Sequence, residues 1–366
     1  MQALITLLPG DGIGPEVISE AHAVLQTVAQ IFQHDFLFAE HAIGGSAIDA
    51  HKNPLPDETL QACLASDAVL LGAVGGPAWD DPRAALRPEQ GLLRLRKEMQ
   101  VFANLRPIHV YPGLRHASPL REERLEKVDI LIVRELTGGL YFGTPRLQER
   151  IDGERRAVDT LEYSESEIRR VVSLALRLAQ ERRKHVTSVD KANVLETSRL
   201  WRQVAAEVAR DFPEVRLENQ LVDSAAMRLI VAPGEFDVLV TENMFGDILS
   251  DAASTLSGSL GLLPSAALGE GKRGLYEPVH GSAPDIAGEG IANPIGAVLS
   301  GAMLLRHSLA LEEAALAVER AVSMTLEANI LTPDLGGEAS TREVGERIRS
   351  FLERTVLPEG QTKENA

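Results

Sequence analysis

The sequence predicts an α/β fold in which buried strands alternate with helices. Nearly continuous apolar runs at 68–71, 129–133 and 236–240 are typical of strands that are covered on both faces. Apolar residues at three- and four-residue spacing indicate helices at 165–182, 197–211 and 293–309. The chain has 366 residues, which exceeds the usual size of one hydrophobic core, so we expect two lobes.

The first predicted unit is a strand, a loop and a helix. Residues 3–8 form the apolar strand, and the glycine- and proline-rich segment 9–15 ends it. From Val17 to Val28 the apolar spacing becomes helical. The glycines at 10, 12 and 14 do not have the Gly-x-Gly-x-x-Gly spacing of the dinucleotide fingerprint, so this loop alone predicts no nucleotide site.

A hairpin-like arm is predicted at about 137–163. Turn-forming residues at 138–139, 145 and 153 separate short segments with alternating apolar side chains. We therefore expect these strands to project from the main sheet.

Composition and charge exclude several classes of protein. The formal net charge is −16, and no run of Lys and Arg forms a basic stripe, so nucleic-acid binding is disfavoured. No apolar stretch reaches the roughly 18 residues that a membrane span needs. The first apolar segment stops at 9–10, too early for a secretory signal, and Cys63 is the only cysteine. We expect a cytoplasmic protein with no membrane partner.

Three segments place arginines beside apolar residues. If 89–96 is helical, four of its side chains share one face, although such a pattern taken alone is more often a core helix with a surface arginine. Arg106 precedes a proline, and Arg134 ends a buried strand, where open α/β sheets bind ligands. The helical face consists of Glu89, Leu92, Leu93 and Arg96.

Two carboxylates point to a metal ion. Asp247 and Asp251 are four residues apart, so on a helix they face the same way and repel each other unless a cation lies between them. Mg²⁺ or Mn²⁺ would relieve this repulsion. The alternative to a metal ion is that Asp247 is an acidic residue stabilised by the helix dipole near the N-terminus. This explains Asp251, one turn further on, less well. Asp223, at the end of a strand, is a candidate third ligand.

Two further side chains are candidates for proton transfer. Lys191 follows the short strand 186–188; such a lysine is usually a solvated charge, but beside a cation it can act as a general base. Tyr141 in the arm is more often a packing residue, yet its phenol can donate a proton to an enolate. The loop 275–288 is rich in Gly, Ser and Pro and can present backbone N–H groups to phosphate.

Together these segments resemble the β-hydroxyacid oxidative decarboxylases, the family of isopropylmalate and isocitrate dehydrogenases. The loop 10–16, the Asn-Leu-Arg-Pro turn at 104–107, the carboxylate block at 241–251 and the loop 277–294 occur in family order and spacing. The match runs from residue 4 to about residue 350. It implies two lobes that share a mixed sheet flanked by helices, with a projecting β arm. Residues 1–100 and 252–366 would bind the cofactor, and 101–251 would bind substrate and metal and form the dimer.

The resemblance also implies roles for individual residues. Arg96, Arg106 and Arg134 would hold the substrate carboxylates. Asp223, Asp247 and Asp251 would bind Mg²⁺ or Mn²⁺. Lys191 and Asp223 would come from the second subunit, so the active site would require a homodimer. The catalytic residues would be Tyr141 and Lys191, and the substrate site would also include Glu89, Leu92, Leu93, Val194 and Asp223. The residues implied for the NAD site are Gly75, Gly76, Pro77, Glu277, His280, Gly281, Ser282, Ala283, Pro284, Asp285, Ile286 and Asn293.

Within the family, the segment 89–96 resembles the version found in the isopropylmalate enzymes. Leu92 and Leu93 suit an isopropyl group and would leave the third carboxylate of isocitrate unpaired, which costs several kcal/mol. Asp285 would repel a 2′-phosphate, so NAD is expected rather than NADP. The expected reaction is the oxidative decarboxylation of 3-isopropylmalate to 2-oxo-4-methylpentanoate and CO₂, in leucine biosynthesis.

Alternatives to this expectation remain. Homoisocitrate, isocitrate and tartrate dehydrogenases share the same machinery. A non-catalytic regulatory subunit would be expected to have lost part of the lysine, tyrosine and aspartate set, all of which is present here. Glu242 departs from the small or amide residue expected at its position, which bears on the local loop and not on the chemistry.

Overall fold

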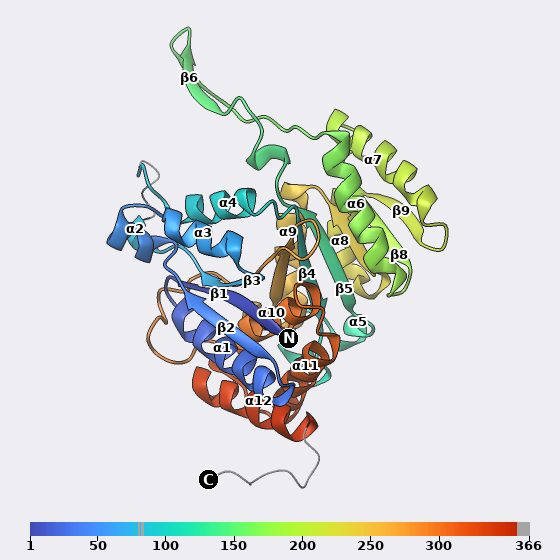
Figure 1. The fold of residues 1–366 in the computed structure, drawn as a ribbon. Helices are drawn as coiled ribbons and strands as arrows, with labels where there is room; N and C mark the ends of the chain where they lie inside the picture. Colours follow the sequence, from blue (N-terminus) through green and yellow to red (C-terminus); the bar gives the residue numbers. More distant parts are fainter. Residues whose placement is uncertain (80, 82–83, 357–366) are drawn as a thin grey trace, which may run out of the picture. The chain divides into compact units, whose positions relative to one another are not determined.

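The computed structural model describes residues 1–79, 81 and 84–356, and the chain divides into two compact units (Figure 1). Unit 1 comprises 1–101, 111–117 and 257–366, and unit 2 comprises 102–110 and 118–256. Residues 357–366, which belong to the predicted cofactor lobe, lie outside the described residues. Both units contain alternating strands and helices, which confirms the predicted α/β class.

Unit 1 is built on five strands in the order β2-β1-β3-β12-β11. β1 (Gln2–Gly10) is parallel to both β2 (Asp35–Glu40) and β3 (Ala68–Ala73), and β12 (Gly274–Pro278) is parallel to β3 and antiparallel to β11 (Pro264–Leu268). Every residue of β3 and β12 is buried, as their apolar composition requires. The helices of unit 1 are α1 (Gly14–Ile31), α2 (Gly45–His51), α3 (Asp57–Ala65), α4 (Pro88–Glu98), α10 (Ile295–His307), α11 (Glu312–Glu327) and α12 (Thr341–Val356).

Unit 2 has a mixed arrangement of five strands in the order β4-β5-β10-β8-β9. β4 (Ala103–His109) is antiparallel to β5 (Asp129–Glu135), whereas β10 (Val238–Thr241), β8 (His185–Asp190) and β9 (Arg216–Leu221) continue the direction of β5. The carboxyl ends of these parallel strands therefore meet at one edge of the sheet. Arg134 lies near the end of β5, and Lys191 and α9 follow β8 and β10. The helices of unit 2 are α5 (Glu122–Leu125), α6 (Glu165–Gln180), α7 (Glu196–Val208), α8 (Val222–Val231) and α9 (Asn243–Ser254).

The predicted arm is present in unit 2 as a separate hairpin. β6 (Leu147–Ile151) pairs with β7 (Glu154–Val158) in antiparallel register, and Figure 1 shows the hairpin extending away from the helices of its unit. Asp152 and Gly153 at the turn have φ angles of 53° and 89°, the positive values that a tight two-residue hairpin turn requires.

The boundaries of several predicted elements differ from the structure, and three helices show this. The predicted helix 197–211 ends as an α-helix at Val208 and continues as the 3-10 turn η4 (Ala209–Asp211). Helix 165–182 ends at Gln180, and helix 293–309 is shorter at both ends as α10. These ends depend on local capping, which apolar spacing does not encode. None of the helices in the described part of the chain is long and apolar enough to cross a membrane.

Candidate active site

The centre of the candidate site lies in unit 2, where α9 packs against β4 and β5. Asn104 and Arg106 are two residues apart on β4 and therefore share a face, and Asn104 is paired in register with Arg134 of β5. Helix α9 starts directly after β10 because Glu242 caps it, with its Oε1 accepting from the backbone N–H of Phe245 at 2.6 Å. Three strands, β4, β5 and β10, thus contact the same helix.

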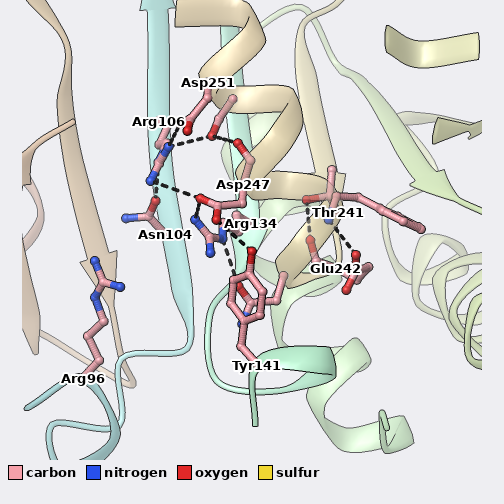
Figure 2. A network of polar contacts seen from close by, with 12 residues as sticks. Arg96, Asn104, Arg106, Arg134, Tyr141, Thr241, Glu242, Asp247 and Asp251 are labelled. Atoms are coloured by element: carbon pink, nitrogen blue, oxygen red, sulfur yellow. Dashed lines mark hydrogen bonds and ion pairs between the residues drawn. The ribbon is translucent and has the colours of Figure 1, made fainter. Parts of the chain in front are cut away.

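Both carboxylates of α9 point toward the arginines of the neighbouring strands (Figure 2). Arg134 Nη1 donates a hydrogen bond to Asp247 Oδ1. Arg106 Nη1 donates to Asp251 Oδ1 and to Ser250 Oγ, each at 2.7 Å, and its Nη2 lies 3.8 Å from Asp247 Oδ1. Arg134 is buried, and Arg106 is largely so. Two guanidinium groups and two carboxylates thus form one connected network.

Tyr141 joins this network from the base of the arm, where it ends the 3-10 turn η3 (Gly139–Tyr141). Its hydroxyl donates to Asp247 Oδ2 at 3.0 Å, and its ring centroid lies 5.8 Å from Arg134 Cζ. Removal of the phenol from water raises the pKa of Tyr141, and the negative charge of Asp247 raises it further. Tyr141 therefore keeps its proton at neutral pH and can donate it.

Two buried asparagines, to which the sequence patterns gave no role, orient the arginines. Asn104 Oδ1 accepts from Arg106 Nε at 2.9 Å, and Asn243 Oδ1 accepts from Arg134 Nε at 3.0 Å. Asn243 also donates from Nδ2 to the carbonyl of Gly138 at 3.0 Å, which ties the base of the arm to the same network. The two-residue spacing of Asn104 and Arg106 could have indicated that they share one face of a strand. Nothing in the local sequence links Asn243 to Arg134.

Glu242, at a position where a small or amide residue was expected, is 5% exposed. One carboxyl oxygen caps α9, while Oε2 is buried and has no hydrogen-bond partner among the described residues. Burial raises the pKa of Glu242 above its ordinary value. Glu242 therefore stabilises the N-terminus of α9, the helix on which Asp247 and Asp251 lie.

Lys191 and Asp223 form a separate pair in unit 2. Lys191 Nζ donates to Asp223 Oδ1 at 2.6 Å, and this hydrogen bond lowers the pKa of Asp223. The Asp223 side chain is 62% exposed and lies in the first turn of α8. Across residues 1–79, 81 and 84–356, no three His, Cys, Asp or Glu side chains are grouped closely enough to hold a metal ion. Asp223 therefore does not complete a three-carboxylate set with Asp247 and Asp251 within one chain.

The four residues predicted to share a helical face lie on α4 in unit 1. Gly91 and Leu95 are the buried residues on this part of the helix, whereas Leu93 is 38% exposed and Leu92 is half-buried. Leu92 and Leu93 are thus not ordinary core residues. Arg96 Nη2 donates to Glu277 Oε1 of β12, so two residues predicted for the substrate and cofactor sites are paired with each other.

The residues predicted to bind NAD lie on two loops of unit 1. The first loop follows β3 and contains Gly75, where an added Cβ would lie 3.1 Å from Glu89 Oε1. The second follows β12, and in it His280 Nδ1 donates to the carbonyl of Gly281 at 2.9 Å. Burial lowers the pKa of His280, so its ring is neutral at pH 7. Of the remaining predicted residues, Ser282 and Asn293 are buried, Gly76, Ala283 and Ile286 are partly exposed, and Pro77, Pro284 and Asp285 are exposed.

Val194 and Asn293 have surroundings that the sequence did not indicate. Val194 is 61% exposed, so a large part of its side chain is free to contact another molecule. Asn293 Oδ1 accepts from Ile295 N at 3.0 Å at the start of α10, and its Nδ2 donates to Asp334 Oδ2 at 3.1 Å. The Asn293 side chain therefore stabilises the loop through hydrogen bonds within the protein.

Comparison with known proteins gives a consistent family assignment. The model of the isocitrate/isopropylmalate dehydrogenase family matches residues 4–348. The 3-isopropylmalate dehydrogenase of Anaeromyxobacter dehalogenans is 61% identical over 96% of this chain and 100% of its own length. The protein of the same name from Bacillus subtilis is 58% identical over 96% of this chain and 98% of its own length.

Solved structures agree with the fold. A crystal structure of isocitrate dehydrogenase from Methylococcus capsulatus aligns with a TM-score of 0.85 at 34% identity, covering 96% of this chain and 100% of that one. A β-decarboxylating dehydrogenase from Thermococcus kodakarensis aligns with a TM-score of 0.79 at 37% identity, covering 99% of this chain and 100% of that one. The predicted likeness of the fold to the isopropylmalate dehydrogenase type is thereby confirmed.

Proposed function

The chain belongs to the isocitrate/isopropylmalate dehydrogenase family, and we propose that it oxidises and decarboxylates 3-isopropylmalate to 2-oxo-4-methylpentanoate and CO₂ with NAD⁺, in leucine biosynthesis. The structural observation that supports this reaction is one hydrogen-bonded network in unit 2. It consists of Arg106, Arg134, Asp247, Asp251 and Tyr141. The high identity to relatives named 3-isopropylmalate dehydrogenase supports the substrate.

The residues of this network fit a divalent cation. Asp247 and Asp251 offer carboxylate oxygens, the ligands that Mg²⁺ and Mn²⁺ prefer. In the structure both carboxylates already pair with positive groups, Arg106 and Arg134, which indicates that this position favours a counter-charge. We propose Asp247 and Asp251 of one chain and Asp223 of a second chain as the ligands.

The chain supplies binding and proton transfer to the reaction. When bound, NAD⁺ provides the oxidant, and the cation withdraws electrons from the substrate oxygen atoms. Arg96, Arg106 and Arg134 bind the two carboxylates of the substrate, because a guanidinium group can donate two parallel hydrogen bonds to a carboxylate. Lys191 of the second chain accepts the proton of the substrate hydroxyl. Loss of CO₂ leaves an enolate carbon, to which Tyr141 donates its proton.

Selectivity for the branched substrate rests on α4. Leu92 and Leu93 are not packed into the core of unit 1, so their aliphatic side chains are free to contact an isopropyl group. Isocitrate would place a third carboxylate against the same leucines, without a partner for its charge. The preference for NAD rests on Asp285, whose exposed carboxylate can accept hydrogen bonds from ribose hydroxyls and would repel a 2′-phosphate.

We also propose that the active unit is a homodimer. On α8, the side chains of Met227, Ile230 and Val231 share one face and are 68%, 62% and 54% exposed, and Ile248 of the contacting helix α9 is 61% exposed. An uncovered apolar face of this kind marks an interface. The occupant we infer is a second copy, because α8 also carries Asp223, the carboxylate that the metal set lacks within one chain.

The protein is an enzyme of amino-acid biosynthesis, and we place it in the cytoplasm. Its one cysteine, Cys63, is buried, and burial raises the pKa of its thiol to about 12. A chain with a single unreactive thiol and no possible internal disulfide fits a reducing compartment.

Substrate profiling tests the proposed function. Initial rates are measured with 3-isopropylmalate, isocitrate, homoisocitrate and tartrate, each with NAD⁺ and with NADP⁺. We expect the highest kcat/KM for 3-isopropylmalate with NAD⁺. A higher kcat/KM for any of the other acids would reassign the substrate, and no turnover of the four would favour the non-catalytic alternative.

A further inference from the structure

The loop at 10–16 has no part in the proposed chemistry, although it is among the most specific motifs of the sequence. It connects β1 to α1 in unit 1, and Asp11 within it is 5% exposed. A buried carboxylate must be satisfied by hydrogen bonds, so its partners indicate what the loop does.

The carboxylate of Asp11 binds the first of the two proposed NAD loops. Its Oδ2 accepts from the backbone N–H of Gly75 and of Gly45, each at 2.8 Å, and its Oδ1 accepts from Ser46 N at 2.8 Å. Gly75 has a φ of +108°, which only glycine adopts readily, so the backbone of the loop at this hydrogen bond requires glycine. A charged acceptor makes such bonds stronger than neutral ones.

The same loop binds the second proposed NAD loop at its other end. Glu16 Oε1 accepts from Gly288 N, and Oε2 accepts from Gly290 N at 3.1 Å. Between the two acids, the N–H of Ile13 donates to the carbonyl of Ser282 at 2.8 Å. A Cβ on Gly12 would lie 1.9 Å from that carbonyl oxygen, so the approach of these two loops requires glycine.

We propose that Asp11 and Glu16 are positioning residues for NAD⁺, which hold the loops after β3 and β12 in the conformation that binds the cofactor. Neither residue needs to touch NAD⁺, because each acts through backbone N–H groups of the loops. Since both acids belong to one short segment, that segment fixes the position of each loop relative to the other. The inference rests on the proposed function, because it assumes that these loops bind NAD⁺.

The test compares Asp11→Asn and Glu16→Gln with wild-type full-length protein. Each variant keeps the shape of the side chain and removes its charge and one acceptor oxygen. We expect the Kd for NAD⁺, measured by calorimetry, to rise roughly tenfold or more, the fold-change that follows from losing one charge-assisted hydrogen bond. KM for NAD⁺ should rise in parallel, while kcat at saturating NAD⁺ stays unchanged.

Glu20→Gln is the matched control. Glu20 lies one turn further along α1 and accepts from Arg349 of α12 at 2.8 Å, not from a backbone N–H of either loop. Its replacement should lower stability without changing the Kd for NAD⁺. An equal rise in Kd in Glu20→Gln, or an unchanged Kd in Asp11→Asn or Glu16→Gln, overturns the assignment.

Hydrogen exchange gives a second readout that needs no turnover. Asp11→Asn should accelerate exchange at 45–46 and 75, whereas Glu16→Gln should do so at 288 and 290. If Asp11→Asn does not fold, the role of Asp11 can still be tested in wild-type protein. Saturating NAD⁺ should slow hydrogen exchange at Gly45 and Ser46, because their N–H groups bind the same carboxylate as Gly75. Unaltered exchange there overturns the role of Asp11. Failure of the wild type to bind NAD⁺ at all would instead refute the proposed function.

Discussion

Replacing Ile230 by Asp should dissociate the proposed dimer. Ile230 is 62% exposed in the single chain, so the substitution removes few contacts from the fold. Complete burial of an isoleucine side chain contributes about 1.5–3 kcal/mol, and covering the exposed part of Ile230 therefore contributes about 1–2 kcal/mol. In a two-fold symmetric interface each substitution counts twice, which gives about 2–4 kcal/mol.

This free energy corresponds to a rise in the dimer dissociation constant of at least roughly 30-fold, because about 1.4 kcal/mol changes an equilibrium constant tenfold. The introduced carboxylate raises the constant further, since burying an unpaired charge is unfavourable. Sedimentation equilibrium measures the constant directly, and turnover should fall at enzyme concentrations at which the variant is monomeric.

Leu37→Asp is the control for a general effect of adding a charge. Leu37 is 49% exposed and lies on the edge strand β2 of unit 1, whereas α8 belongs to unit 2. The reasoning fails if the wild type is monomeric at micromolar concentration, or if Ile230→Asp weakens the dimer no more than Leu37→Asp does.

Three further predictions concern the site. Lys191→Met should nearly abolish turnover without changing the thermal unfolding midpoint, because it removes the proposed base from a partly exposed position; a near-normal rate would exclude that role. EDTA should stop turnover and added Mg²⁺ or Mn²⁺ should restore it, whereas full activity in metal-free buffer would contradict a metal requirement. Burial raises the pKa of Glu242 above its ordinary value of 4.5, so the native state retains a proton that the unfolded chain loses. Its contribution to stability is complete below pH 4.5 and declines as pH rises toward the native pKa. Glu242→Gln has no ionisable carboxyl group, so urea unfolding should show it gaining stability relative to wild type as pH rises above 4.5. A difference that does not change with pH would refute the assignment.

Several features of the site could be predicted from local sequence because they depend on short-range periodicity. The four-residue spacing of Asp247 and Asp251 places both on one face of α9, and the glycines and alternating residues of 137–163 specify a hairpin. The assignment of catalytic roles drew instead on the resemblance to a family, since Lys191 and Tyr141 taken alone are more often a surface charge and a packing residue.

The partners of these side chains were decided only by tertiary structure. Arg134 and Asn243 are 109 residues apart, and they meet because β5 and β10 are neighbours in the strand order. Asp11 and Gly75 are 64 residues apart and meet because β1 pairs with β3. By itself the sequence indicated several of the strands and helices and which face their side chains occupy, because backbone geometry repeats every two or 3.6 residues. The pairing of distant segments has no such local period, and it is this pairing that gives each buried charge its partner.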